Sequence, residues 1–152
     1  MPEAVKIPYR RLGRSGLAVS RLCLGAMMFG DQTEEGAAAA ILDSARAVGV
    51  NFIDTADTYA QGRSEKIVGR LIVADRDDWV LATKVANPNG NGPNRRGASR
   101  KWLLEAVPRC LQRLETDYID ILYLHKEDLA TPVEETVRAL SDLLARGQIR
   151  YF

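Results

Sequence analysis

Short apolar segments alternate with longer amphipathic segments along most of this chain. The apolar segments predict β-strands at 21–25, 50–54, 79–83 and 118–124, with a fifth beginning at 148–152. Between them, apolar residues recur at helical spacing in 34–47, 64–73, 99–114 and 131–146. This alternation predicts an α/β fold, with a parallel sheet, helices outside it and right-handed crossovers.

The ends of these elements carry recognisable signals. Two short strands, 10–12 and 17–19, flank a turn bounded by Gly13 and Gly16, which predicts a small hairpin before the sheet. Thr33 and Ser64 are expected to cap the first two helices. The segment 131–134 reads as a capping box with proline at the first helical position, and Pro108 is expected to kink the third helix.

Length and charge narrow the class of protein. With 152 residues and a net charge of +1, the chain is expected to form one domain, without a nucleic-acid or membrane surface as its main partner. No apolar run approaches the roughly 20 residues of a membrane helix, and the N-terminus lacks a secretory signal, so we expect a cytoplasmic protein. Cys23 and Cys110 are expected to pack among apolar neighbours, and one histidine makes a metal site improbable.

Polar side chains follow the predicted strands where each apolar run ends. Asp54 ends the second strand, Lys84 follows the third and His125 follows the fourth. Because neighbouring strands lie about 4.8 Å apart and ligands bind beyond the carboxyl ends of parallel strands, we expect these side chains to converge at one edge. Tyr59, five residues beyond Asp54, can return from its loop into the same space.

This set of groups suits the protonation of a developing oxyanion. A phenol with an ordinary pKa near 10 is a poor acid at neutral pH, but a neighbouring ammonium stabilises the phenolate. Lys84 can supply that ammonium, and Asp54 can hold it in place. His125 can donate a hydrogen bond to a carbonyl oxygen that becomes negative as a nucleophile such as hydride attacks its carbon.

Each residue also has a structural interpretation. Asp54 alone could cap the turn after its strand, Tyr59 could pack over a helix, and a lone histidine such as His125 is more often structural than catalytic. Lys84 is harder to explain in this way, because a lysine that closes an apolar strand is costly unless it is paired. The agreement of three consecutive strand ends favours a site.

A Rossmann-type phosphate loop is not indicated. No G-x-G-x-x-G follows a strand, and the glycines at 90, 92 and 97 have the wrong spacing. Their loop, 87–97, is long for a connection, which marks it as a candidate functional segment. Met27 and Met28 end the first strand, where they could contact a flat ring.

Six stretches of the chain resemble the aldo-keto reductase family, and they cover almost its whole length. They are RLGRSGLAVSRLCLGAMMFG, NFIDTADTYAQGRSE, WVLATKV, RLETDYIDILYLHKED, TPVEETVRAL and GQIRYF. The match is closest to the bacterial branch that also resembles potassium-channel β subunits. The resemblance implies a TIM barrel with its bottom closed by the hairpin, and NADPH-dependent reduction of a small carbonyl substrate.

The resemblance also assigns roles to individual residues. It implies that Asp54, Tyr59, Lys84 and His125 are catalytic, with Tyr59 as the acid that protonates the carbonyl oxygen. Contacts to the NADPH cofactor are expected near Ala26, Met27, Gln32 and Asp54.

The number of strands departs from the family pattern. A TIM barrel has eight strands and typically about 250 residues, whereas this chain offers four β/α units and the start of a fifth strand. We therefore expect a partial, truncated barrel, with 1–152 as the N-terminal half of the barrel domain. A second hypothesis is a catalytically silent half-barrel that pairs with itself, or with a missing second half, through its open sheet edges. A third is a Schiff-base lyase that uses Lys84.

Overall fold

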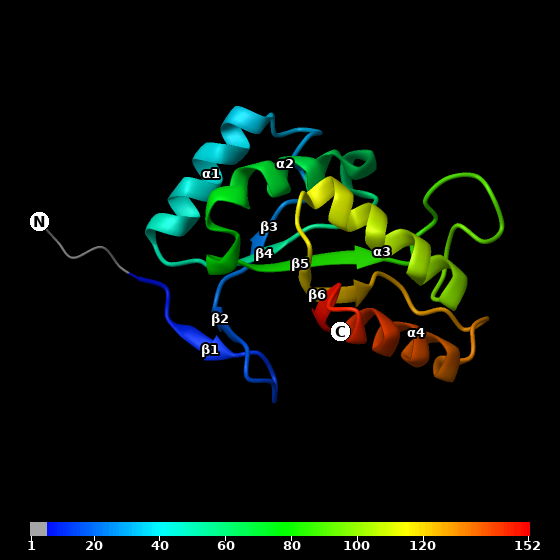
Figure 1. The fold of residues 1–152 in the computed structure, drawn as a ribbon. Helices are drawn as coiled ribbons and strands as arrows, with labels where there is room; N and C mark the ends of the chain where they lie inside the picture. The colour runs from blue at the N-terminus through cyan, green and yellow to red at the C-terminus, as the bar shows by residue number, and fades with distance from the viewer. Residues whose placement is uncertain (1–5) are drawn as a thin grey trace, which may run out of the picture.

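A computed structural model describes residues 6–152, and its centre is a parallel sheet of five strands. In spatial order these are β3 (Leu24–Gly25), β4 (Phe52–Asp54), β5 (Val80–Val85), β6 (Ile119–Leu124) and β7 (Ile149–Tyr151). The order in space equals the order in the chain, as expected when each strand is followed by a helical crossover to its neighbour. Figure 1 shows this progression from β3 at the blue end of the chain to the red C-terminus.

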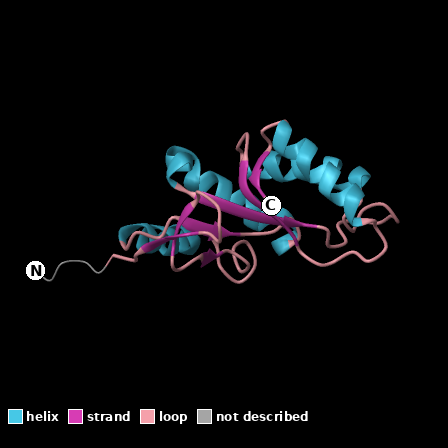
Figure 2. Cartoon of the chain, turned by 90° about the horizontal axis from the view of Figure 1, so that it is seen from below, coloured by secondary structure: helices cyan, strands magenta, loops and turns pink. Residues whose placement is uncertain are grey.

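Four helices connect the strands. They are α1 (Glu35–Ala47), α2 (Arg63–Ile72), α3 (Arg100–Leu114) and α4 (Val133–Ala145), with two short 3₁₀ segments, η1 (Tyr59–Gly62) and η2 (Val73–Asp78). Figures 1 and 2 show the helices packed along the outside of the curved sheet. None of the helices in residues 6–152 is long and apolar enough to cross a membrane.

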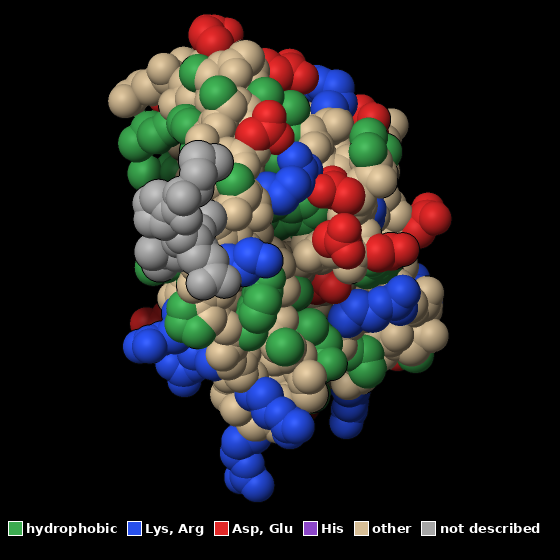
Figure 3. All heavy atoms as spheres, turned by 90° about the vertical axis from the view of Figure 1, so that its left-hand side faces the viewer, with side chains coloured by type: hydrophobic (Ala, Val, Ile, Leu, Met, Phe, Trp, Pro, Cys, Tyr) green, Lys and Arg blue, Asp and Glu red, His purple; other side chains and the backbone are tan. Residues whose placement is uncertain are grey.

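The hairpin precedes the sheet as predicted. It consists of β1 (Tyr9–Arg11) and β2 (Ala18–Ser20), which pair antiparallel. Figure 1 shows it on the side of the sheet away from α1, α2 and α3. Basic side chains project from the lower end of the face in Figure 3, whereas Val19 of β2 is buried. The hairpin therefore presents a charged surface to solvent and an apolar residue to the sheet.

The two faces of the sheet bury different apolar clusters. The helix-facing side joins the main core, in which Ile53, Leu81 and Leu122 pack with residues of the four helices. The opposite, inner face carries a smaller cluster, which packs against the hairpin. Its members are Val19, Phe52, Val80, Ala82 and Ile121, with Leu12 and Leu17 at its margin. The inner face is thus closed by apolar residues at its amino end.

One close contact between helices depends on glycine. Gly69 of α2 is buried against the C-terminal turn of α3, and a Cβ at this position would lie 2.3 Å from the carbonyl oxygen of Leu114. Only a residue without a side chain permits this approach. The glycine that lowers the helix propensity of α2 therefore allows α2 and α3 to pack.

Several predicted helix starts were wrong. Residue Glu34, not Thr33, occupies the N-cap of α1, and it makes no side-chain capping bond. Ser64 lies inside α2, where its hydroxyl donates to the carbonyl oxygen of Ala26, so it joins two elements instead of capping one. Thr131 donates to Asp128, and Pro132 is the N-cap residue of α4.

The remaining differences concern the first strand, a cysteine and a proline. The first core strand is short, because only Leu24 and Gly25 pair with β4, and Cys23 before it is exposed, contrary to the prediction. Cys110 is buried as expected. Helix α3 runs to Leu114 as a single helix through Pro108, which lies exposed.

Candidate active site

Three of the predicted site residues lie at the carboxyl ends of adjacent strands. Asp54 is the last residue of β4, Lys84 is the next-to-last residue of β5, and His125 directly follows β6. In the pairing register, Asp54 lies beside Ala82 and Lys84 beside Tyr123. Since side chains alternate between the faces of a strand, Asp54, Lys84 and Tyr123 share the inner face, above its apolar cluster.

Lys84 is the centre of the arrangement. Its Nζ donates to Asp54 Oδ2 at 2.5 Å, to the carbonyl oxygen of Thr55 at 2.9 Å and to Tyr59 Oη at 3.1 Å. The same ammonium lies 4.7 Å from the centre of the Tyr59 ring. The side chain of Lys84 is only 16% exposed, so these partners replace most of the water that its charge requires.

His125 lies on the other side of Tyr59. The two rings meet edge to face, with centroids 5.7 Å apart and planes at 86°. Burial and the nearby Lys84 ammonium lower the pKa of His125 below its usual 6.5, against the opposing effect of Asp54. The imidazole is therefore neutral at pH 7 and retains one N–H donor. Tyr59 thus contacts a cation through its hydroxyl and a neutral imidazole through its ring.

The segment that carries Tyr59 is tied to the sheet. Beyond Asp54, the backbone N–H of Thr55 donates to the carbonyl oxygen of Ala82 at 2.9 Å, and that of Asp57 to the carbonyl oxygen of Lys84 at 3.0 Å. The hydrogen-bond ladder between β4 and β5 therefore continues almost to Tyr59.

A sharp reversal follows Tyr59. Ala60 and Gln61 both adopt left-handed backbone conformations, with φ of 48° and 58°. Such conformations are unfavourable for residues with a Cβ, so the surrounding contacts must hold them. After this reversal, α2 begins at Arg63. The backbone around Tyr59 is therefore held by the bonds to β5 on one side and by α2 on the other.

The residues expected to contact the cofactor have different surroundings. Ala26 is fully buried, and its backbone N–H donates to the carbonyl oxygen of Asp54. Met27 is exposed beside it, and Met28 is also exposed. Gln32 lies exposed in the turn before α1, and it makes no hydrogen bond to the four clustered residues. The structure therefore bonds Ala26 to Asp54, while the side chains of Met27 and Gln32 are exposed to solvent.

Two groups of residues near the site are not evident from the sequence. Tyr123 lies beside Lys84 on the inner face, a position that the apolar run of its strand concealed. Behind the site, the fully buried carboxylate of Glu65 accepts hydrogen bonds from Thr83 and Arg113, both at 2.6 Å. Asp57 is also buried. The acidic residues in NFIDTADTYAQGRSE are the only sequence signal for the buried pair, and their spacing does not tell which one faces the core.

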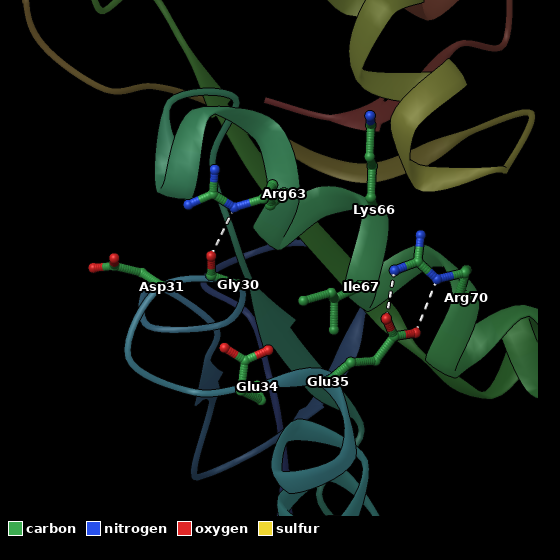
Figure 4. A pocket seen from close by; sticks show the side chains of 8 residues that line it. All are labelled: Gly30, Asp31, Glu34, Glu35, Arg63, Lys66, Ile67 and Arg70. Carbon is green, nitrogen blue, oxygen red and sulfur yellow. Dashed lines mark hydrogen bonds and ion pairs between the residues drawn. The ribbon is translucent and has the colours of Figure 1, made fainter.

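A hollow on the outer surface of the molecule contains none of these groups. It lies between α2 and the segment before α1 (Figure 4), and it is lined by Gly30, Asp31, Glu34, Glu35, Arg63, Lys66, Ile67 and Arg70. Arg63 donates to the carbonyl oxygen of Gly30, and Arg70 makes two bonds to Glu35. Its acidic and basic side chains balance, so its charge selects neither a cation nor an anion.

Comparison with known proteins adds a family to this geometry. Residues 21–152 match the model of the Aldo/keto reductase family. The chain is 45% identical over 148 residues to a probable voltage-gated potassium channel subunit beta of Oryza sativa subsp. japonica, covering 95% of this chain and 45% of that protein. It is 42% identical over 145 residues to the uncharacterized oxidoreductase YqkF of Bacillus subtilis (strain 168), covering 94% and 47%.

A solved structure agrees with the fold. The chain superposes on the aldo-keto reductase AKR11C1 from Bacillus halodurans (holo form) with a TM-score of 0.86 and 40% identity, covering 95% of this chain and 49% of that one. The predicted family resemblance and the predicted partial TIM-barrel fold are thereby confirmed. The chain spans about half the length of the relatives that it matches.

Proposed function

Because the chain belongs to the aldo/keto reductase family, we propose that it carries the acid–base site for NADPH-dependent reduction of an aldehyde or ketone to an alcohol. The observation that supports this most is the contact of Lys84 Nζ with both Asp54 and Tyr59 Oη. Tyr59, Lys84, Asp54 and His125 are its catalytic residues, and residues 1–152 act as the N-terminal half of the barrel domain.

The residues present fit the nicotinamide end of the cofactor. Met27 offers an exposed apolar surface one residue beyond Ala26, whose backbone is bonded to Asp54. Asp54 Oδ1 has no hydrogen-bond partner among residues 6–152 and can accept from a carboxamide. Ala26 gives this surface a rigid backbone through its bond to Asp54, and Gln32 contributes at the edge. When bound, the nicotinamide supplies the hydride that reaches the carbonyl carbon.

The protein residues supply the proton. As the carbonyl oxygen becomes negative, Tyr59 gives it the phenolic proton, and the Lys84 ammonium stabilises the phenolate that remains. Asp54 keeps that ammonium in place. His125 orients the carbonyl oxygen through its N–H and adds no second positive charge, since the ring is neutral. Solvent then returns a proton to Tyr59.

The two other hypotheses fare differently. A Schiff base requires a free, uncharged amine, whereas Lys84 donates to three acceptors, which disfavours that chemistry. A silent assembly piece is supported by the edges of the sheet, because β3 and β7 each pair on one side only within residues 6–152. This second candidate predicts an oligomer that neither binds NADPH nor reduces a carbonyl compound.

The test is the replacement Tyr59→Phe, which removes only the phenolic oxygen. We expect kcat for NADPH-dependent reduction of a generic aldehyde to fall by at least about 10²-fold, the usual contribution of a general acid. The matched control is Tyr118→Phe, at the amino end of β6, whose hydroxyl donates to Asp77. Equal turnover in Tyr59→Phe and wild type would remove Tyr59 from the mechanism. NADPH binding to the 152-residue chain is measured by quenching of the tryptophan fluorescence. Absence of binding would favour the assembly hypothesis.

A further inference from the structure

Asp57 lies behind the proposed site and is almost fully buried. Its side chain is 2% exposed, and its backbone N–H is bonded to the carbonyl oxygen of Lys84. Oδ2 accepts from Asn89 Nδ2 at 3.1 Å, which ties the turn before Tyr59 to the loop 87–97. Oδ1 has no hydrogen-bond partner within residues 6–152. A buried carboxylate oxygen without a partner is costly, so its surroundings should offer one.

The partner is suggested by a small pocket between the loop 87–97 and α3. It measures about 30 Å³ and is lined by Asp57, Asn89, Trp102, Ala106, Arg109 and Arg113. Trp102 Nε1, on a side chain that is 1% exposed, also has no partner within the described residues. An indole N–H can only donate and a carboxylate can only accept. The pocket has room for one water molecule, which can accept from Trp102 and donate to Asp57.

The charges around Asp57 come from two helices. Glu65 faces it from α2, and Arg113, Arg109 and Cys110 face it from α3. Arg113 is bonded to Glu65 and Arg109 to Glu105, so neither guanidinium is dedicated to Asp57. Burial raises the pKa of Asp57 to about 6, and the charge of Glu65 adds to this. The Asn89 hydrogen bond, the charge of Arg113 and the backbone N–H of Thr58 oppose it. Asp57 therefore changes its charge just below neutral pH.

We propose that Asp57 is an ionisable positioning residue, which holds the turn carrying Tyr59 to Trp102 of α3 through one buried water and to loop 87–97 through Asn89. When Asp57 is protonated on Oδ1, it donates to the water, which can accept this bond together with the one from Trp102, and Oδ2 still accepts from Asn89. When Asp57 is ionised, the same contacts enclose a charge that burial disfavours. Because burial favours the neutral carboxyl, the link is tightest below pH 6 and loosens as Asp57 ionises above it. Its effect on turnover rests on the proposed reductase function, but the link itself does not.

The link is tested by nuclear magnetic resonance of the two indole N–H groups, of Trp79 and Trp102, from pH 5 to 8. The Trp79→Phe variant assigns the two signals. We expect the Trp102 signal to shift with a midpoint near pH 6 in the wild-type chain, to stay fixed in Asp57→Asn, and to shift as before in His125→Gln, which removes the only histidine. A Trp102 signal that does not shift, or one that still shifts in Asp57→Asn, would overturn the proposal.

The consequence for catalysis is measured separately. Above pH 6 we expect KM for the aldehyde to rise several-fold in the wild type and in the matched surface variant Asp117→Asn, and to stay constant in Asp57→Asn. A shift of the Trp102 signal in a chain without reductase activity would leave the link in place and refute only the proposed function. A KM that rises equally in Asp57→Asn would exclude the positioning role.

Discussion

At the scale of single residues, Lys84 decides how the site can work. Its three hydrogen bonds leave no N–H for a substrate, so the lysine acts on a substrate only through Tyr59. Loss of Asp54 would remove a charged partner from a largely buried cation, which is more damaging than loss of a surface ion pair. The ammonium is thus a fixed element of the electrostatics, and the neighbouring imidazole reports on it.

The pKa of His125 allows the electrostatic effect of Lys84 and Asp54 to be measured. Burial and then Lys84 lower the pKa of His125, whereas Asp54 raises it. Replacing the cation in Lys84→Met should therefore move the His125 titration midpoint upward, and removing the anion in Asp54→Asn should move it downward. The ring-proton resonance of His125 gives both midpoints directly. Shifts in the same direction for both variants would show that burial changes, rather than charges, dominate.

The sequence located the cluster because Asp54, Lys84 and His125 lie at the ends of apolar strands and Tyr59 follows Asp54 by five residues. The register of parallel strands then places them at one edge, as the distances around Lys84 show. Asp57 was not found, since a loop aspartate three residues after Asp54 carries no sign of burial. What buries it is the approach of Asn89 and Trp102 from distant parts of the chain.

At the scale of elements, the contact between α2 and α3 explains why a glycine stands at position 69, inside a helix. Helix propensity alone predicts that alanine at position 69 would stabilise α2. The backbone of Leu114, however, occupies the place of the missing side chain. Long-range packing thus reverses the local preference, and such a contact has no signature in the sequence near Gly69.

This packing contact predicts opposite changes in the free energy of unfolding for two glycine substitutions. Gly69→Ala should lower the free energy of unfolding by about 1–3 kcal/mol, because a backbone carbonyl cannot rotate out of the way as a side chain does. Gly36→Ala in α1 is the matched control, since a Cβ there meets nothing within 4 Å, and it should raise stability by up to about 1 kcal/mol. Urea unfolding followed by circular dichroism measures both. Stabilisation by Gly69→Ala would mean that the two helices are not in this contact.

At the scale of the whole molecule, the inner face of the sheet has an apolar layer and a polar layer. The hairpin covers the apolar layer, and Asp54, Lys84 and Tyr123 lie in the layer beyond it. Alternation of strands and helices predicted the sheet and its order. The length of the first strand was not predictable, since the apolar run at 21–25 does not reveal that only two residues pair with β4.

Because Val19 of the hairpin packs in the apolar layer, the hairpin should contribute to the free energy of unfolding. Val19→Ala removes two buried methyl groups from the apolar layer and should cost roughly 1–3 kcal/mol in the free energy of unfolding. Val133→Ala is the control, because Val133 is 66% exposed and its truncation should change stability by less than about 0.5 kcal/mol. Thermal unfolding compares the two variants. Equal effects would indicate that the hairpin does not close the inner face.

The bonds from Thr55 and Asp57 to β5 have a consequence for motion. A segment that looks like a connection in the sequence is held by the same kind of bonds as a core strand, so its amides should exchange with deuterium as slowly as those of β5 and not at the pace of surface turns. The phenol proposed to deliver the proton would then be mounted on one of the stiffest parts of the molecule. In the proposed reaction, a substrate would have to adapt to the position of this hydroxyl.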